Sequence, residues 1–323
     1  MPSRDSALAG RASFIKTIES SEEFKILDKF VHYPEARVEG YVNQIIDQCN
    51  IAMIIDDKYP EEGVANVDTN LCWALLELAQ RLPPSKQTKL VQMLAELQTR
   101  TVMHPVTGQP LTYQGDVLFT DLPASGWSEL EAFDEHGGDW HDITDPDMDP
   151  ECQDRWVNLN AFVAQMSQAA ELREPFNDSQ KVHRMDRSLR AIWVMREALE
   201  NDTRPLEELV ESAAMRAACM WFIYAADRLR QKVDFQVRYP DLHGAPGSKY
   251  ADKGWRGHEL ERWIMWMQRL NELKAVCASY ETERLIEIAQ ENIFRVMPPC
   301  DFDVAMKDNR TSIIARWPGD EIP

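Results

Sequence analysis

The stretch Leu71–Leu97, LCWALLELAQRLPPSKQTKLVQMLAEL, carries the strongest structural signal in the chain. Its apolar residues recur at steps of three and four on both sides of Pro83-Pro84, which is the spacing of one helix face. The two prolines interrupt this spacing, so we expect two helices joined by a short turn and packed antiparallel. Asp68 or Thr69 is the expected cap of the first helix, and Ser85 is the expected start of the second.

The same helical spacing extends to both sides of this stretch. It predicts helices over residues 22–32, 35–55, 151–172, 179–200, 205–233, 257–278 and 282–296. Strand-like alternation of useful length and fixed-period repeats are not evident. With 323 residues and 44% hydrophobic residues, the chain is long and apolar enough to bury a sizeable core. The expected fold is therefore all-α, a single domain of about ten helices forming an irregular bundle with two lobes.

Residues 104–148 break the pattern, because glycine and proline recur there with little helical period. The region is also strongly acidic, with thirteen Asp and Glu between positions 116 and 155 against Arg155 alone. We expect a long irregular acidic connection over about 104–148. It would join an N-terminal lobe (about 1–103) to an aromatic-rich C-terminal lobe (about 149–300), followed by a tail (301–323).

The charge balance limits the partners of this chain. With 54 acidic and 35 basic residues, the net charge is −19, which disfavours binding to nucleic acid or to anionic lipid. The most apolar long stretch, 213–226, contains Arg216 and is too short to span a bilayer. The first residues lack the features of a secretory leader, so we expect a cytoplasmic protein.

Motifs for metals and cofactors are weak. The six cysteines are far apart without a CxxC pair, and Asp56-Asp57 with Glu61 has Pro60 inside its spacing. The acidic region places His136, Asp139, His141 and Asp142 close together in sequence, but clustered acids are usually solvated surface. Phosphate-binding loops, nucleophile elbows and dinucleotide fingerprints do not occur. We therefore expect no metal and no cofactor.

Aromatic residues concentrate in the second half of the chain, where polar residues interrupt the apolar helix faces. Trp263, Trp266, Met267 and Leu270 form one continuous helical stripe. Such a stripe packs as core more often than it lines a pocket, and both interpretations stay open here. If it lines a pocket, the candidate substrate-binding residues are Trp156, Trp221, Trp263, Trp266 and Met267, and the candidate catalytic residues are Asn160, Tyr224 and Asp227.

Six segments, in this order, resemble a fungal family of uncharacterised proteins known as domain of unknown function 3632. The resemblance implies an all-helical fold and a fungal setting, often in a metabolite gene cluster or specific to one lineage; it supplies no catalytic residues. The segments are LDKFVHYPEARVEGYVNQI (Leu27–Ile45), LCWALLELAQRLPPSKQTKLVQMLAEL (Leu71–Leu97), FTDLP (Phe119–Pro123), RWVNLNAFVAQM (Arg155–Met166), WFIYAADRL (Trp221–Leu229) and LERWIMWMQRL (Leu260–Leu270).

Two functions fit these observations. The first is small-molecule binding in the aromatic second half, in a cofactor-independent tailoring enzyme or cyclase of fungal secondary metabolism that acts on an apolar substrate. The second is a non-catalytic helical adaptor that presents its acidic loop to a basic partner protein. We favour the first because so many tryptophans concentrate in one half; formation of a homo-oligomer is left open.

Overall fold

The computed structural model describes residues 4–55, 60–137, 141–171 and 183–298, and helices dominate this part of the chain. The prediction of an all-α multi-helix bundle is confirmed. A hairpin of β1 (Thr112–Tyr113) and β2 (Asp116–Val117) is the only sheet within the described ranges. The α-helices are α1 (Arg4–Ser20), α2 (Glu22–His32), α3 (Val38–Ile55), α4 (Pro60–Arg81), α5 (Thr88–Leu97), α6 (Ser125–Gly137), α7 (Pro150–Ala169), α8 (Leu189–Met195), α9 (Leu206–Leu209), α10 (Ala213–Asp234), α11 (Asp241–Gly244), α12 (Leu260–Val276) and α13 (Tyr280–Val296).

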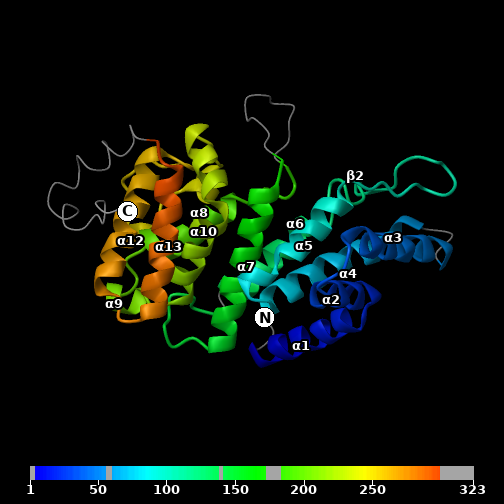
Figure 1. Cartoon of the computed structure of the whole chain (residues 1–323), viewed down its shortest axis with the longest axis horizontal. Helices are drawn as coiled ribbons and strands as arrows, with labels where there is room; N and C mark the ends of the chain where they lie inside the picture. The colour runs from blue at the N-terminus through cyan, green and yellow to red at the C-terminus, as the bar shows by residue number, and fades with distance from the viewer. Residues whose placement is uncertain (1–3, 56–59, 138–140, 172–182, 299–323) are drawn as a thin grey trace, which may run out of the picture.

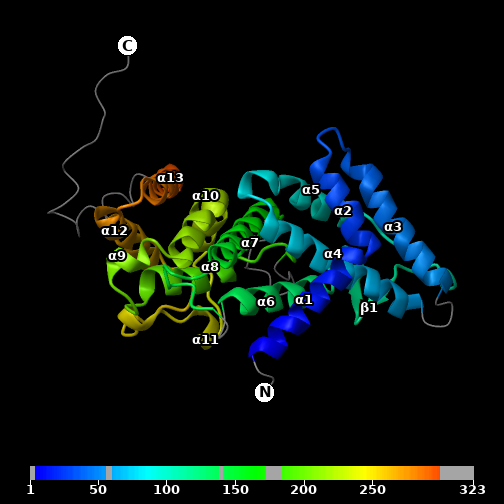
Figure 2. The ribbon, with the colours of Figure 1, turned by 90° about the horizontal axis from the view of Figure 1, so that it is seen from below.

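The helices are arranged on both sides of α7, which runs through the middle of the molecule (Figure 1). Helices α1–α5 lie on one side and α8–α13 on the other, and the view from below in Figure 2 shows the same division. Helix α7 packs against α4 and α5 with one face and against α10 with another. The main core of buried side chains extends from α1 to α13, and Val157, Ala161 and Met220 form a small second cluster.

Helix α4 begins at Pro60, eight residues before the expected cap at Asp68. Asp68 lies inside the helix, is completely buried, and accepts a hydrogen bond from the Ala124 amide at 2.9 Å. The Asp68 side chain therefore binds a distant segment and does not cap the start of its own helix. The local sequence does not reveal this distant partner. The turn after Pro83 is confirmed, but a 3₁₀ turn (Pro84–Lys86) occupies it and α5 starts at Thr88 instead of Ser85.

The expected irregular connection over 104–148 contains a helix of 13 residues, α6. The expectation is wrong there because arginines distant in sequence neutralise many of its acids. Buried Glu129 accepts two hydrogen bonds from Arg190, at 2.6 and 2.9 Å, and Asp142 pairs with Arg204 at 2.9 Å. These contacts attach the acidic segment to the C-terminal half of the molecule.

Other helix boundaries differ from the expected ones by a few residues or by an interruption. The expected helix over 205–233 is divided into α9 and α10, because Ser212 caps α10 by accepting a hydrogen bond from the Met215 amide. The helix expected over 179–200 is α8 followed by a π-helical turn (Arg196–Glu200), and residues 179–182 lie outside the described residues. Helix α1 was not expected, because few apolar residues mark its face.

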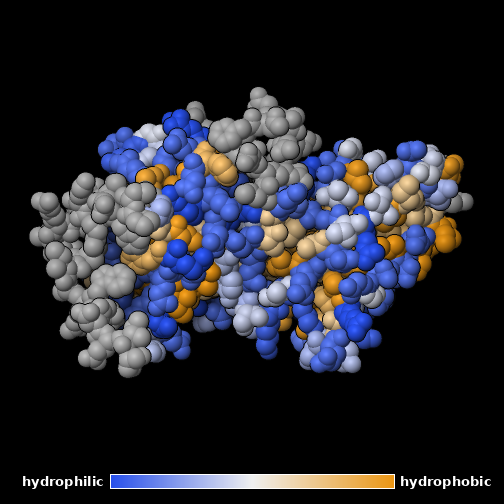
Figure 3. Space-filling view, turned by 45° about the horizontal axis from the view of Figure 1, so that its top comes forward, coloured by the Kyte–Doolittle hydropathy of each residue, from blue (hydrophilic) through white to orange (hydrophobic). Residues whose placement is uncertain are grey.

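Hydrophilic side chains cover most of the face in Figure 3. In the part of the chain that the structure describes, no helix is both long enough and apolar enough to cross a bilayer. The candidate residues Asp56, Asp57 and Asp139 lie outside the described residues, as does the tail 301–323.

Candidate functional site

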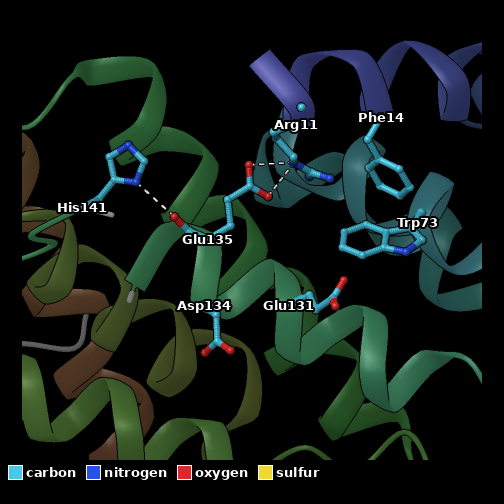
Figure 4. Close-up of a pocket in the computed structure, with 8 residues that line it drawn as sticks. Arg11, Phe14, Trp73, Glu131, Asp134, Glu135 and His141 are labelled. Carbon is cyan, nitrogen blue, oxygen red and sulfur yellow. Dashed lines mark hydrogen bonds and ion pairs between the residues drawn. The ribbon is translucent and has the colours of Figure 1, made fainter. Parts of the chain in front are cut away.

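A pocket of about 390 Å³ opens where α1, α4 and α6 meet (Figure 4). Helix α1 supplies one wall, α4 supplies an aromatic side chain, and α6 supplies three carboxylates. The volume lies within the range of about 300–1,000 Å³ that is typical of small-molecule sites. Its lining residues are Gly10, Arg11, Phe14, Trp73, Glu131, Asp134, Glu135 and His141.

Two aromatic rings form the apolar part of this pocket. Phe14 and Trp73 meet edge to face, with ring centroids 5.0 Å apart and planes at 81°. This geometry is the favoured one for aromatic pairs, and it fixes α1 against α4. Trp73 is only 6% exposed, and its indole N–H donates to no residue that the structure describes.

Arg11 lies between these rings and the acidic side of the pocket. Its guanidinium carbon is 5.0 Å from the Trp73 ring centroid and 5.4 Å from that of Phe14, within the range of cation–π attraction. Its Nε donates to Glu135 at 2.7 Å, and its Nη2 is 3.7 Å from a carboxylate oxygen of Glu77. Arg11 thus connects the rim of the pocket to a buried carboxylate.

Glu77 is that buried carboxylate, and it holds three helices together. Arg81 lies 2.6 Å from it within α4, and Arg155 of α7 lies 2.7 Å from it. With Arg11 of α1, three guanidinium groups surround one completely buried carboxylate. A buried charge needs such pairing, because an isolated one would be strongly destabilising. This cluster positions α1, and with it Arg11 and Phe14, over Trp73.

The rim of the pocket carries free negative charge. Glu131 and Asp134 are exposed, and neither has an ion-pair or hydrogen-bond partner among the described residues. The Nδ1 atom of His141 lies 3.0 Å from the main-chain oxygen of Glu135. Figure 4 shows Arg11 and Glu135 joined at the centre, with Glu131 and Asp134 on the same helix.

The structure places the predicted aromatic site residues in the core. Trp221, Trp263 and Trp266 have no exposed surface, Trp156 is 3% exposed and Met267 is 8% exposed. The Trp266 N–H donates to Glu200 at 2.7 Å, and Glu200 also pairs with buried Arg262. Trp156 packs edge-on against Phe133, and both line a smaller cavity of about 180 Å³. Access of a ligand to the three fully buried tryptophans would require the core to open.

The three predicted catalytic residues have different surroundings. Asn160 is completely buried; it accepts a hydrogen bond from Trp221 Nε1 at 3.0 Å and donates to the Trp156 main-chain oxygen at 3.0 Å. Tyr224 is half-buried, and burial raises its pKa. Asp227 is partly exposed and accepts two hydrogen bonds from Arg295, at 2.9 and 2.6 Å, which lower its pKa. None of the three lines the pocket at α1.

Metal binding finds no support in the described residues, where no group of three or more His, Cys, Asp or Glu side chains is placed to hold an ion. His141 is held by the Glu135 main chain. Asp142 accepts hydrogen bonds from Thr144 and Arg204, which lower its pKa. The side chain of His136 lies outside the described residues.

Sequence reasoning did not identify the residues of the α1–α4–α6 pocket as a site. Arg11 and Phe14 are 59 or more positions from Trp73, so their contact has no local signal. Glu131, Asp134 and Glu135 were noted only as members of an acidic stretch. Their spacing of three and four residues, once α6 is a helix, places them on one face.

The fold and this pocket define an all-α protein with a site of small-molecule size. The chain belongs to a family of proteins of unknown function, DUF3632, whose model matches residues 73–270. The matched part contains Trp73, Glu131 and His141, whereas Arg11 and Phe14 of α1 precede it. No curated protein and no solved structure matches the chain.

Proposed function

We propose that this protein binds a small molecule in the pocket between α1, α4 and α6. The supporting observation is a concave site of about 390 Å³ that combines the Phe14–Trp73 pair with a few polar groups. Small-molecule sites characteristically have mainly apolar walls and few polar groups that orient the ligand. The ligand's apolar body would pack against the two rings.

This proposal keeps the expected class of ligand and changes its location. The tryptophans of the second half make tight internal contacts, such as Trp263 against Phe222 with ring centroids 5.6 Å apart. Opening that core would lose several well-packed contacts, whereas the pocket at α1 is already open. Catalysis by Asn160, Tyr224 and Asp227, a fungal metabolic setting, a cytoplasmic location and a homo-oligomeric state stay predictions.

The adaptor hypothesis is less favoured, because much of the acidic segment is used internally. Glu129, Asp142 and Asp116 pair with Arg190, Arg204 and Arg184. Carboxylates that hold the fold together are poorly available to a basic partner protein. Glu131 and Asp134, like Asp147 and Glu151, have no such partner among the described residues, and the first two belong to the proposed site.

Gly10 offers a direct test, because it lines the pocket and a Cβ atom there would meet nothing within 4 Å. Gly10→Leu should fill the pocket while strengthening α1, since Gly inside a helix is destabilising by about 0.5–1 kcal/mol relative to Ala. Gly40→Leu on α3 is the matched control: its Cβ also meets nothing within 4 Å, and it lies outside the pocket.

The probe is 3-methylindole, a neutral molecule that fits the volume, measured by saturation-transfer NMR and isothermal calorimetry. We expect binding to the parent protein and to Gly40→Leu, and loss of binding in Gly10→Leu, with all three proteins equally helical by circular dichroism. Absence of binding to the parent protein would refute the proposal, and so would equal binding to Gly10→Leu.

A further inference from the structure

We infer that the ligand of the α1–α4–α6 pocket is an organic cation, with an amine or amidine group attached to an apolar or aromatic body. This inference rests on the proposed function and deepens it by naming the class of ligand. Four observations support it. They are the charge balance of the pocket lining, the position of Arg11 against the two aromatic rings, the carboxylates of Glu131 and Asp134 without a partner among the described residues, and the indole N–H of Trp73.

The charge balance of the lining is negative. Glu131, Asp134 and Glu135 line the pocket together with one guanidinium, that of Arg11. The ion pair of Arg11 with Glu135 neutralises one of the three carboxylates, at 2.7 Å. The surrounding protein reinforces this balance, because the whole chain carries a net charge of −19. An anionic ligand would be repelled, while a cation would be attracted over distances up to about a Debye length, roughly 8 Å in physiological salt.

Arg11 shows that the aromatic part of the pocket accepts a cation. Its guanidinium lies over Trp73 and Phe14 while its Nε donates to Glu135. Aromatic faces combined with a carboxylate are the usual means of holding a basic group next to an apolar body. A ligand amine placed beside Arg11 would meet the same kind of surroundings, with Glu131 or Asp134 in the role of Glu135.

Glu131 and Asp134 are available for that role. They are three positions apart on α6, which places their side chains on the same helix face. Neither has a partner among the described residues, although much of the same acidic segment is ion-paired. Two exposed carboxylates at the rim would bind an ammonium group while the aromatic pair holds the apolar body.

Trp73 supplies the fourth observation, because it lines the pocket and carries a hydrogen-bond donor. Trp73 is 6% exposed, lines the pocket, and donates to no residue that the structure describes. An oxygen or nitrogen acceptor on the ligand body would satisfy this donor.

Three indole probes of matched shape separate charge from size. Tryptamine is cationic, 3-methylindole is neutral and indole-3-acetate is anionic. We expect tryptamine to bind the parent protein about tenfold more tightly than 3-methylindole, as one favourable rim ion pair would give. Indole-3-acetate should bind more weakly than either. Added salt should weaken the binding of tryptamine and leave the binding of 3-methylindole unchanged.

A charge-matched pair of variants localises the effect. Glu131→Gln with Asp134→Asn removes the two rim charges, and Glu39→Gln with Asp47→Asn removes two exposed charges from α3. The rim variant should lose the preference for tryptamine, about tenfold, and keep its affinity for 3-methylindole. The α3 variant should behave as the parent protein does.

The outcomes distinguish the two proposals. If Gly10→Leu abolishes the binding of 3-methylindole but tryptamine binds the parent protein no more tightly than 3-methylindole does, the cation inference is overturned and the proposed function stands. An unchanged tryptamine preference in the rim variant, or an equal loss in the α3 variant, also overturns the cation inference. If none of the three probes binds the parent protein, both proposals fail.

Discussion

Asp68 is predicted to make the stability of this protein fall as pH rises from about 4 to about 6. The residue is completely buried within α4; one carboxylate oxygen accepts from the Ala124 amide and the other has no hydrogen-bond partner among the residues that the structure describes. Burial raises its pKa from 3.8 to about 6. Its titratable neighbours are the buried thiols of Cys49 and Cys72, whose pKa values are raised, so they stay neutral in this range.

The sign follows from proton linkage. The folded state binds the Asp68 proton more tightly than the unfolded state, so the stability contribution is full below pH 3.8 and is lost as pH rises to about 6. At about 1.4 kcal/mol for each pKa unit, the loss is about 3 kcal/mol, and it persists at neutral pH.

Asp68→Asn tests this reasoning, because the amide oxygen can still accept from Ala124 but the side chain cannot ionise. Between pH 4 and pH 7.5, the free energy of unfolding of the variant relative to the parent protein should increase by about 3 kcal/mol. Urea titrations followed by circular dichroism at several pH values measure this difference. Asp68→Ala, which leaves the Ala124 amide without its acceptor, should be less stable than Asp68→Asn at every pH. A difference between Asp68→Asn and the parent protein that does not change with pH would refute the reasoning.

Three further predictions concern the C-terminal half. Burial and the nearby cations of Arg262 and Lys232 lower the pKa of His258 to about 3, so its folded form binds the proton less tightly and stability should be lost as pH falls from 6.5 towards 3. In urea titrations, His258→Gln should reduce the loss of unfolding free energy between pH 6.5 and pH 3. A loss as large as that of the parent protein would contradict this prediction. Trp263→Ala and Trp266→Ala should each destabilise the protein by about 3–5 kcal/mol, because both rings are completely buried. The denaturant midpoint of each variant measures this loss. An unchanged midpoint for Trp266→Ala would instead favour a pocket at that residue. Asp227→Asn should change stability by about 0–1 kcal/mol, since its ion pair is exposed, and a larger loss in thermal unfolding would contradict this.

The candidate site shows which kind of information the sequence lacks. Trp73 lies in the strongest helical stretch of the chain, yet nothing in that stretch indicates that Phe14 packs against it at 5.0 Å. The binding site was predicted in the tryptophan-rich second half because aromatic residues are common both in cores and in pockets. Burial alone separates the two, and Trp221, Trp263 and Trp266 have none of their surface exposed.

The sequence by itself determined the all-α class and the positions of helices such as α2 and α13, because helical periodicity is a local property of neighbouring residues. Tertiary structure alone decided that α4 starts at Pro60, that an acidic stretch folds as α6, and that a pocket opens beside α1. Each of these depends on partners far apart in the chain: Asp68 with Ala124, Glu129 with Arg190, and Arg11 with Glu135. Buried carboxylates and helix ends are stable only when such partners meet them, and only the folded chain brings those partners together.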